Sequence, residues 1–242
     1  MKRIHRFGRG DLIAVWLCSV LLVVCLGAIG AGGKRRVKES ICAANLKGWG
    51  QALFAFAEDN DGYLLYRSYN AVGWYLALGP YCIDKKLLFC PEATATYAEG
   101  GVNPHMAWET DIWGDPNLSR GSYVINLWIT QEPNDRHWEK ACVSSASSVP
   151  MVLDAQWRDM EPYASDEPLP YETSLWTPHA DEMQRVCVNR HGGVNVVFMD
   201  GSVRKIGLKH LWVQRWYRGW EDDLAATGLP EWPEWMANFK DP

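Results

Sequence analysis

The sequence predicts an α+β protein in which a long N-terminal helix packs on a small antiparallel β-sheet. Two observations lead to this prediction: an uncharged apolar run over residues 12–33 that passes into a helical pattern, and three later segments rich in β-branched and aromatic residues. Apolar residues make up 48% of the 242 residues and charged residues 22%, as in folded domains. This length suits one globular domain with an anchor, because a single core stops growing at roughly 250–300 residues.

The apolar run predicts a transmembrane helix. Residues 12–33, LIAVWLCSVLLVVCLGAIGAGG, contain no charged side chain, and a helix needs about 20 apolar residues to cross the hydrocarbon core. We expect residues 1–11 to form a short basic leader on the cytoplasmic side. The alternative is a cleaved secretory signal ending near Ala31, although the run exceeds the roughly 7–15 apolar residues of such a signal.

Residues 34–60 are predicted to continue as an amphipathic helix, here named the stem. Two interior glycines, Gly48 and Gly50, each weaken such a helix by about 1 kcal/mol relative to alanine. The pattern ends near Glu58, before a turn at Gly62. The apolar residues recur largely at steps of three and four: Val37, Ile41, Ala44, Leu46, Trp49, Leu53 and Phe56.

Residues 61–242 are predicted to form a Trp-rich globular head. Strand patterns lie at residues 121–128, 149–154 and 194–199, and Asp200-Gly201 predicts a hairpin turn into a partner strand at 202–206. We expect these strands to form one antiparallel sheet. Residues 92–120 are rich in turn residues and predict a long surface loop, whereas residues 208–220 return to a helical pattern, followed by an extended tail.

The cysteines leave two interpretations open. In an oxidising compartment, Cys82 and Cys90 form the most plausible disulfide because only a short loop separates them, and Cys142 with Cys187 is a second conceivable pair. Alternatively, the head's cysteines are reduced and buried. No C-x-x-C pair occurs, so the sequence does not indicate a zinc ribbon or a thioredoxin-type site.

The candidate chemistry is sparse. His191, Asp154 and Asp200 could meet on neighbouring strands as a metal site or an acid–base pair, but a His before a Gly-Gly turn more often bonds the backbone, and Asp200 has a structural role in its turn. No nucleophile elbow, P-loop or HExxH motif occurs. We therefore predict no catalytic residue, cofactor or metal, and no enzymatic activity.

The possible partners follow from charge and aromatic content. The net charge is −5 with no long basic stripe, so we expect no binding to nucleic acid. Six tryptophans fall in predicted loops and strand ends, where exposed rings could stack on carbohydrate, although core filling is the simpler role. They are Trp108, Trp113, Trp128, Trp138, Trp157 and Trp176. Three more, Trp212, Trp216 and Trp220, are expected in the core or at subunit contacts.

Several segments resemble one bacterial family. Cys42, Asn45-Leu46, Gln51-Ala52-Leu53 and the Glu58–Gly62 stretch are similar to the region after the membrane helix in prepilin-type, pseudopilin-like proteins. The segment Arg190–Gly201 resembles the C-terminal His-x9-Asp-Gly signature of the planctomycete-type processing-associated group, with His191, Asp200 and Gly201 as the motif residues. Eight residues rather than nine separate His191 from Asp200.

The resemblance implies a pilin-like fold and a structural role. The chain would be a single-pass protein of the inner membrane with a periplasmic head, and a subunit, with other pilin-like proteins, of a filament or of a machine of the type II secretion or type IV pilus kind. Peptidase processing would follow Gly10, but the family's Glu at the fifth mature position is replaced by Val15. That departure favours the alternative function, a monomeric membrane-tethered module that binds carbohydrate or protein without assembling.

Overall fold

The computed structural model describes residues 9–68, 73–82, 84–110, 120–175, 177 and 181–242. The helices are α1 (Arg9–Asp59), α2 (Trp74–Ala77) and α3 (Trp220–Thr227). The strands are β1 (Ala95–Thr96), β2 (Met106–Glu109), β3 (Arg120–Gly121), β4 (Tyr123–Asn126), β5 (Pro150–Asp154), β6 (Asp159–Met160), β7 (Val194–Phe198) and β8 (Val203–Ile206). Short 3-10 helices connect them, among them η2 (Lys85–Leu88), η6 (Glu182–Arg185) and η7 (Lys209–Val213). The α+β class is confirmed.

The chain divides into two compact units, one ending at Lys38 and one beginning at Glu39. The first unit is helical from Arg9 onwards, and large apolar side chains on it are exposed, including Trp16 at 65% and Leu21 at 67%. Among the described residues, no helix combines the length and apolar character of a membrane span. The predicted helical run to about Glu58 is confirmed, since α1 ends at Asp59.

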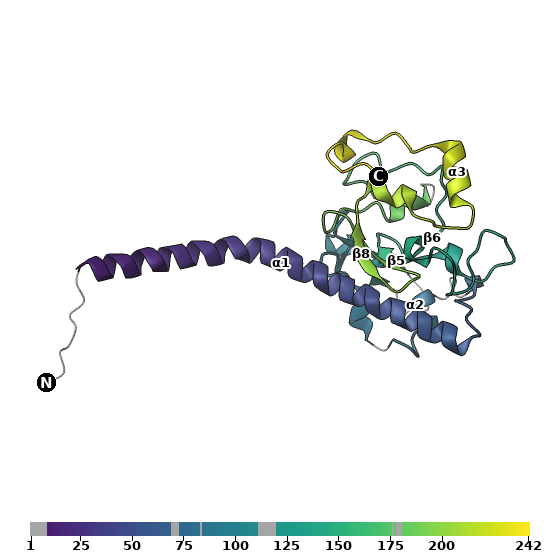
Figure 1. The fold of residues 1–242 in the computed structure, drawn as a ribbon, viewed down its shortest axis with the longest axis horizontal. Helices are drawn as coiled ribbons and strands as arrows, with labels where there is room; N and C mark the ends of the chain where they lie inside the picture. The colour runs from purple at the N-terminus through teal and green to yellow at the C-terminus, as the bar shows by residue number, and fades with distance from the viewer. Residues whose placement is uncertain (1–8, 69–72, 83, 111–119, 176, 178–180) are drawn as a thin grey trace. The chain divides into compact units, whose positions relative to one another are not determined.

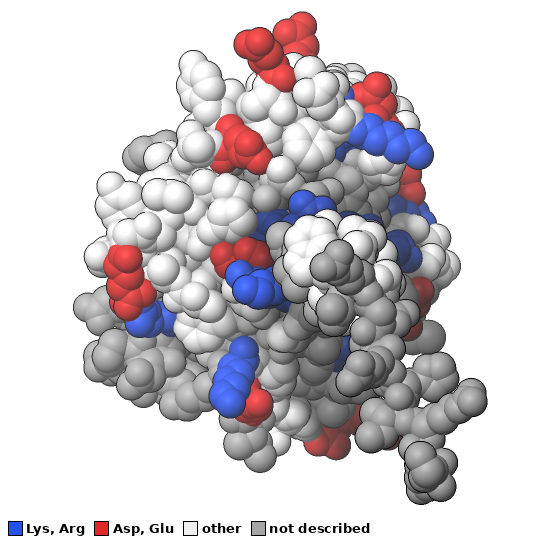
Figure 2. All heavy atoms as spheres, turned by 90° about the vertical axis from the view of Figure 1, so that its left-hand side faces the viewer, with Lys and Arg blue, Asp and Glu red and all other residues white. Residues whose placement is uncertain are grey.

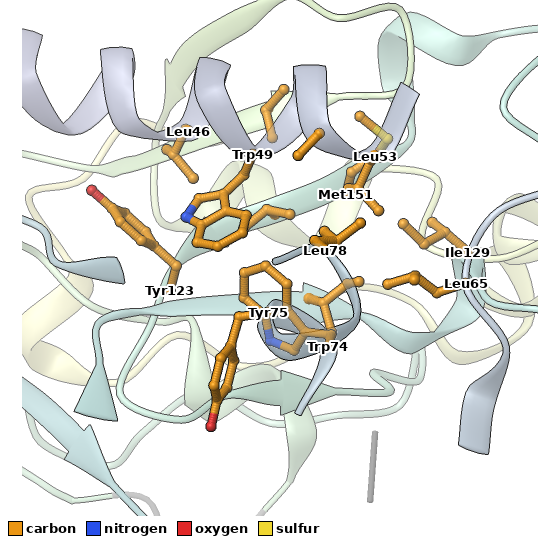
Figure 3. Packing of buried hydrophobic residues seen from close by; sticks show 14 of the residues in the cluster. Leu46, Trp49, Leu53, Leu65, Trp74, Tyr75, Leu78, Tyr123, Ile129 and Met151 are labelled. Carbon is orange, nitrogen blue, oxygen red and sulfur yellow. The ribbon is translucent and has the colours of Figure 1, made fainter. Parts of the chain in front are cut away.

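Within the second unit, the stem part of α1 buries one face against the head. Leu46, Trp49 and Leu53 point from the helix into the cluster that contains Trp74 and Tyr123 (Figure 3). The fully buried positions begin at Cys42 and recur at steps of four and three, as an amphipathic helix requires. Val37 and Ile41, which were predicted to belong to this face, are 58% and 44% exposed, so the buried face is shorter than the sequence pattern.

The two stem glycines allow the helix to lie close to the head. A Cβ at Gly50 would stand 2.7 Å from Cγ2 of Val197 in β7, closer than real Cβ contacts. A Cβ at Gly48 would stand 3.1 Å from the side-chain end of Leu87. The glycines that weaken the isolated helix therefore remove side chains at the contact with the sheet and with η2.

The central sheet has the strand order β6-β4-β5-β7-β8. Strands β4, β5, β7 and β8 pair antiparallel as predicted, but β6 pairs parallel to β4, so the expectation of a purely antiparallel sheet is wrong. The predicted hairpin joins β7 and β8 through Asp200-Gly201, where Gly201 has a φ of 76°. This left-handed backbone favours glycine over residues with a Cβ.

Both faces of the sheet are covered, because neighbouring residues of one strand belong to different core clusters. Ile125 of β4 and Val197 of β7 pack towards α1. Val124 and Val196, their neighbours along the strands, pack with the C-terminal segments, including Trp212, Trp216 and Trp220. In Figure 1, β5 and β8 lie between the stem part of α1 and α3. The core prediction for these three tryptophans is confirmed.

Two other sequence predictions need correction. The segment 92–120 is not only a loop, since β1, β2 and β3 form a second sheet in the order β1-β2-β3. Strands this short cannot be recognised from periodicity. Of the helical pattern predicted over residues 208–220, only Lys209–Val213 is helical as the 3-10 helix η7, and α3 begins at the last residue of that range, Trp220. α3 then runs to Thr227 through the segment that was predicted to be extended.

A buried carboxyl supports the C-terminal layer. Asp166 accepts hydrogen bonds from the backbone N–H groups of Tyr163 at 3.1 Å and Met183 at 3.0 Å, while its carbonyl accepts from Nε1 of Trp212 at 2.7 Å. Burial raises the pKa of Asp166 to about 7. Its ionised form therefore costs the folded state free energy at neutral pH.

We expect Gly50→Ala to destabilise the head by about 1–3 kcal/mol, despite the better helix propensity of alanine, because the new methyl group overlaps Val197. Gly48→Ala is the matched control, and it should cost less because the end of the Leu87 side chain can move. Urea unfolding followed by tryptophan fluorescence measures both changes. Equal stabilities of the two variants would contradict the proposed close contact.

We expect Asp166→Asn to gain stability relative to the wild type as the pH rises from about 4 to about 7. In this window the folded wild type retains a proton on Asp166 that the unfolded chain has released, so rising pH removes stability from the wild type only. Asparagine still offers an oxygen to both N–H groups. The difference in unfolding free energy between the proteins should change by roughly 2–4 kcal/mol. A difference that does not vary with pH would refute the assignment.

Candidate metal centre

Four buried side chains with atoms that can bind a metal converge beneath the stem. The sulfur atoms of Cys42 and Cys90, a carboxylate oxygen of Asp154 and a ring nitrogen of His191 all lie within 4.8 Å of one another. Sγ of Cys42 is 3.3 and 3.4 Å from the two oxygens of Asp154, and Sγ of Cys90 is 3.1 Å from Nε2 of His191. Nε2 of His191 is 3.8 Å from Oδ2 of Asp154. We name these four residues the Cys-Asp-His cluster.

Each member of the cluster comes from a different segment of the chain. Cys42 begins the buried face of α1, and Asp154 is the last residue of β5. Cys90 follows η2, and its N–H donates to Oγ of Ser122 at 2.7 Å. His191 precedes β7, so the cluster joins the stem, a loop and two adjacent strands of the sheet.

A Gly-Gly turn sets the position of His191. Gly192 has a φ of 74°, and a Cβ at Gly193 would stand 2.4 Å from the carbonyl oxygen of Ile206 in β8. Nζ of Lys205 in β8 donates to the carbonyl oxygen of His191 at 2.9 Å. The turn therefore fixes the backbone of His191 against β8 while Nε2 of its side chain faces Cys90 and Asp154. The predicted role of this side chain, bonding the backbone at a strand corner, is not what the structure has.

The neighbouring Arg190 is a buried cation with many partners. Its guanidinium donates to the carbonyl oxygens of Pro104 at 2.6 Å, Met106 at 2.8 Å, Ser122 at 2.7 Å and Ala155 at 2.5 Å. Nη1 also lies 3.5 Å from Oδ1 of Asp154, with both side chains fully buried. Oδ2 of the same carboxylate accepts the N–H of Asn195 at 3.1 Å. Both oxygens of Asp154 are thus held from outside the cluster.

The cluster perturbs the acidity of its members. The neighbouring Cys42 thiol, as a hydrogen-bond partner, lowers the pKa of Cys90 to about 4 against the effect of burial, and His191 and Arg190 add to this. Burial raises the pKa of Asp154 to about 7, and the charge of Cys90 adds to the rise. Burial lowers the pKa of His191, but the hydrogen bond to Cys90 and the charge of Asp154 together raise it.

The cluster is closed to solvent. All four residues are buried, and Cys42, Cys90, Asp154 and His191 each have an exposed fraction of 0%. A thiolate beside an imidazole is the arrangement of cysteine nucleophiles, but such nucleophiles lie where a substrate can reach them. The geometry therefore suits a structural role, either as a hydrogen-bonded network or as a ligand set for a metal ion.

The structure brings together only part of the predicted candidate set. Asp154 and His191 meet, as they would in a metal site or an acid–base pair, but Asp200 does not join them. Asp200 is exposed at the other end of β7, where its carboxylate accepts from the N–H of Ser202 at 2.9 Å and from its hydroxyl at 2.6 Å. The predicted turn role of Asp200 is confirmed. The His-x8-Asp-Gly spacing is the length of one strand with its flanking turns.

The structure contradicts both predicted disulfides of the head. Cys82 and Cys90 are both free thiols, and so are Cys142 and Cys187, so neither conceivable pair is bonded. Cys90 faces His191 instead of Cys82. Sequence reasoning missed Cys42 and Cys90 as cluster members because no C-x-x-C spacing marks them. The only signal was that Cys42 and His191 belong to segments of the family resemblance.

The predicted sugar-stacking rings are largely unavailable. Trp108, Trp128 and Trp138 are at most 5% exposed, because their indole N–H groups donate to backbone carbonyls inside the head. Trp157 packs against the apolar core that contains Leu46 and Trp49 of the stem. Trp113 and Trp176 lie outside the described residues. Trp108, Trp128 and Trp138 therefore fill the core, which was the simpler of the two predicted roles.

We expect Arg190→Met to destabilise the head by about 3–5 kcal/mol, because it leaves the Asp154 carboxylate and several buried carbonyl oxygens without their donor. Arg204→Met is the control, since Arg204 is an exposed residue of β8, and it should cost less than about 1 kcal/mol. Urea unfolding at neutral pH compares the two variants. A wild-type midpoint for Arg190→Met would contradict the role assigned to this side chain.

The comparisons with known proteins returned no match. No family model, no curated protein and no solved structure matches this chain. The resemblance to prepilin-type proteins, which rests on motifs in the sequence, stays a prediction.

Proposed function

We propose that this chain is a membrane-anchored, pilin-like structural subunit whose head lies outside the cytoplasm. The observation that carries the proposal is the single helix α1, which joins the uncharged run of residues 12–33 to a stem that is buried in the head. A helix that continues without a break from such a run into a folded head is the arrangement expected of a pilin-like subunit.

The exposed side chains of the uncharged run support this proposal. Ile13, Val15, Trp16, Leu17 and Leu21 are all more than half exposed in the isolated chain. Apolar surface in water costs roughly 25 cal/mol per Å², and contiguous exposed patches of this kind mark contacts with lipid or protein. Lipid, or the helices of neighbouring subunits within a membrane, would cover these side chains.

The surface of the head is compatible with an extracytoplasmic location. Figure 2 shows a face on which acidic and basic side chains are interspersed, without a continuous basic stripe. Basic residues cluster around the apolar run: Lys2, Arg3, Arg6 and Arg9 before it, and Lys34, Arg35, Arg36 and Lys38 after it. Basic groups on both sides do not set the orientation by themselves, so the short N-terminus is placed in the cytoplasm as the simpler topology.

The second candidate function is a monomeric, membrane-tethered module that binds a protein partner. One observation favours it: the fifth residue after Gly10 is Val15, where prepilin-like subunits that assemble carry a glutamate. The burial of Trp108, Trp128 and Trp138 removes much of the argument for carbohydrate as its ligand. The two functions differ in whether α1 contacts other copies.

We expect the full chain to stay with the inner membrane after an alkaline wash and to require detergent for release. A Leu17→Arg/Leu21→Arg variant should lose this retention, because each arginine costs about 2.5–3.5 kcal/mol at the centre of a membrane helix. Val37→Arg is the matched control: its side chain is equally exposed but lies after the run, so retention should persist. Mass spectrometry should find an N-terminus at Met1 or directly after Gly10. Cleavage near Ala31, or release without detergent, would end the proposal.

Oxidative cross-linking in membranes separates the two candidates. Cys18 is exposed on α1, so copies packed side by side should form disulfide-linked dimers in a Cys25→Ser background. Cys18→Ser in the same background is the control and should abolish the product. An absence of cross-linking while the chain remains in the membrane would favour the monomeric tethered module over the filament subunit.

A further inference from the structure

The Cys-Asp-His cluster has the composition of a zinc site. Zinc binds thiolate, imidazole and carboxylate ligands, and its structural sites hold four protein ligands in a tetrahedron. Ligand bonds of about 2.0–2.3 Å place neighbouring ligand atoms of a tetrahedron roughly 3.3–3.8 Å apart. Measured through Oδ2 of Asp154, the distances of 3.4 Å to Cys42 and 3.8 Å to His191 fall in this range, and the 3.1 Å between Cys90 and His191 is slightly shorter. All four ligand atoms lie within 4.8 Å of one another, so small shifts would bring the remaining pairs into the range.

The charges around the cluster match a divalent cation. With both cysteines ionised, the thiolates and the Asp154 carboxylate carry three negative charges in a region closed to water. The Arg190 guanidinium beside Asp154 supplies one positive charge, and a divalent ion would supply the other two. A buried assembly without net charge avoids the desolvation cost that an uncompensated ion would carry.

The groups that hold the cluster from outside also fit a metal site. Carboxylates that bind metals are themselves held by hydrogen bonds that fix their orientation. Asp154 has two such partners, since Nη1 of Arg190 lies near one oxygen and the N–H of Asn195 donates to the other. The N–H of Cys90 is fixed on Ser122, which in turn donates to the carbonyl oxygen of Ala93 at 2.9 Å. The ligand atoms are therefore placed before any ion binds.

We infer that Cys42, Cys90, Asp154 and His191 form a structural zinc site that fastens the stem of α1 to the sheet. Four protein ligands would complete the tetrahedron and leave no position for water or substrate, which distinguishes a structural from a catalytic zinc. Cys42 is the only ligand on the helix, and the other three belong to the head's loop and strands. The inference concerns the interior of the head and does not depend on membrane attachment.

The first test measures metal in the full-length protein, purified in detergent under reducing conditions. After addition of equimolar Zn²⁺ and removal of the excess, elemental analysis should find about one zinc ion per chain. Cys42→Ser and Cys90→Ser should each reduce the zinc content at least tenfold. Cys187→Ala is the matched control, because Cys187 is a free, buried thiol that packs in the core with Trp212 and lies outside the Cys-Asp-His cluster. This variant should retain the metal.

Two further measurements use only the wild type, so they do not depend on the folding of a variant. Co²⁺ in place of Zn²⁺ should give the visible absorption of a tetrahedral site with thiolate-to-metal charge transfer. Alkylation of the unfolded chain without reductant should find Cys42 and Cys90 as free thiols. A metal-free protein, whether its two thiols are free or joined in a Cys42–Cys90 disulfide, overturns the inference. Zinc retained by a Cys42→Ser/Cys90→Ser double variant overturns it equally.

Discussion

The buried guanidinium of Arg190 is the interaction on which the centre of the head depends. It binds the carbonyl oxygens of two residues at or just before the start of β2, one residue before β4 and one residue after β5, so one side chain joins the small sheet to the large one. Residues at the ends of strands have backbone carbonyl groups outside the sheet's hydrogen-bond ladder, and these groups need other donors when water is excluded. Arginine suits this position because its planar group offers five N–H donors and stays charged when buried. The same side chain lies against Asp154, so the cluster and the fold share one support.

Three layers follow from the residues of the central strands. In β7, Val194, Val196 and Phe198 belong to the C-terminal core cluster, while Val197 belongs to the cluster of the stem. A strand that is apolar on both faces needs a cover on each side. The stem of α1 supplies one cover, and the tryptophan-rich C-terminal segments supply the other. The indole N–H groups of Trp212, Trp216 and Trp220 are satisfied by backbone carbonyls, which lets large rings lie fully inside.

Sequence reasoning succeeded where local chemistry determines the structure. The hairpin of β7 and β8 follows from Asp200-Gly201 between two strand patterns, and the stem follows from a repeat that needs no knowledge of its partner. It failed where residues distant in the chain decide the outcome. The pairing of β1 with β2 involves two residues on β1, and the Cys-Asp-His cluster takes one residue from each of four separate segments. Single cysteines without a close neighbour carry no spacing signal, and the burial of Trp108 or Trp128 depends on carbonyl partners that no pattern reveals.

Cys42 lies where the stem helix would begin to separate from the head, so a bond at this residue would stabilise their contact. A helix that separates from its support begins to do so at an end of its buried face, where the fewest contacts must break. Cys42 is the first fully buried residue of the stem, and the residues before it, such as Ile41, are exposed. A metal bond or a hydrogen bond placed several turns later would leave this end free to fray. The contact of the Cys42 thiol with the Asp154 carboxylate therefore stabilises the stem at the end of the buried face where separation would start.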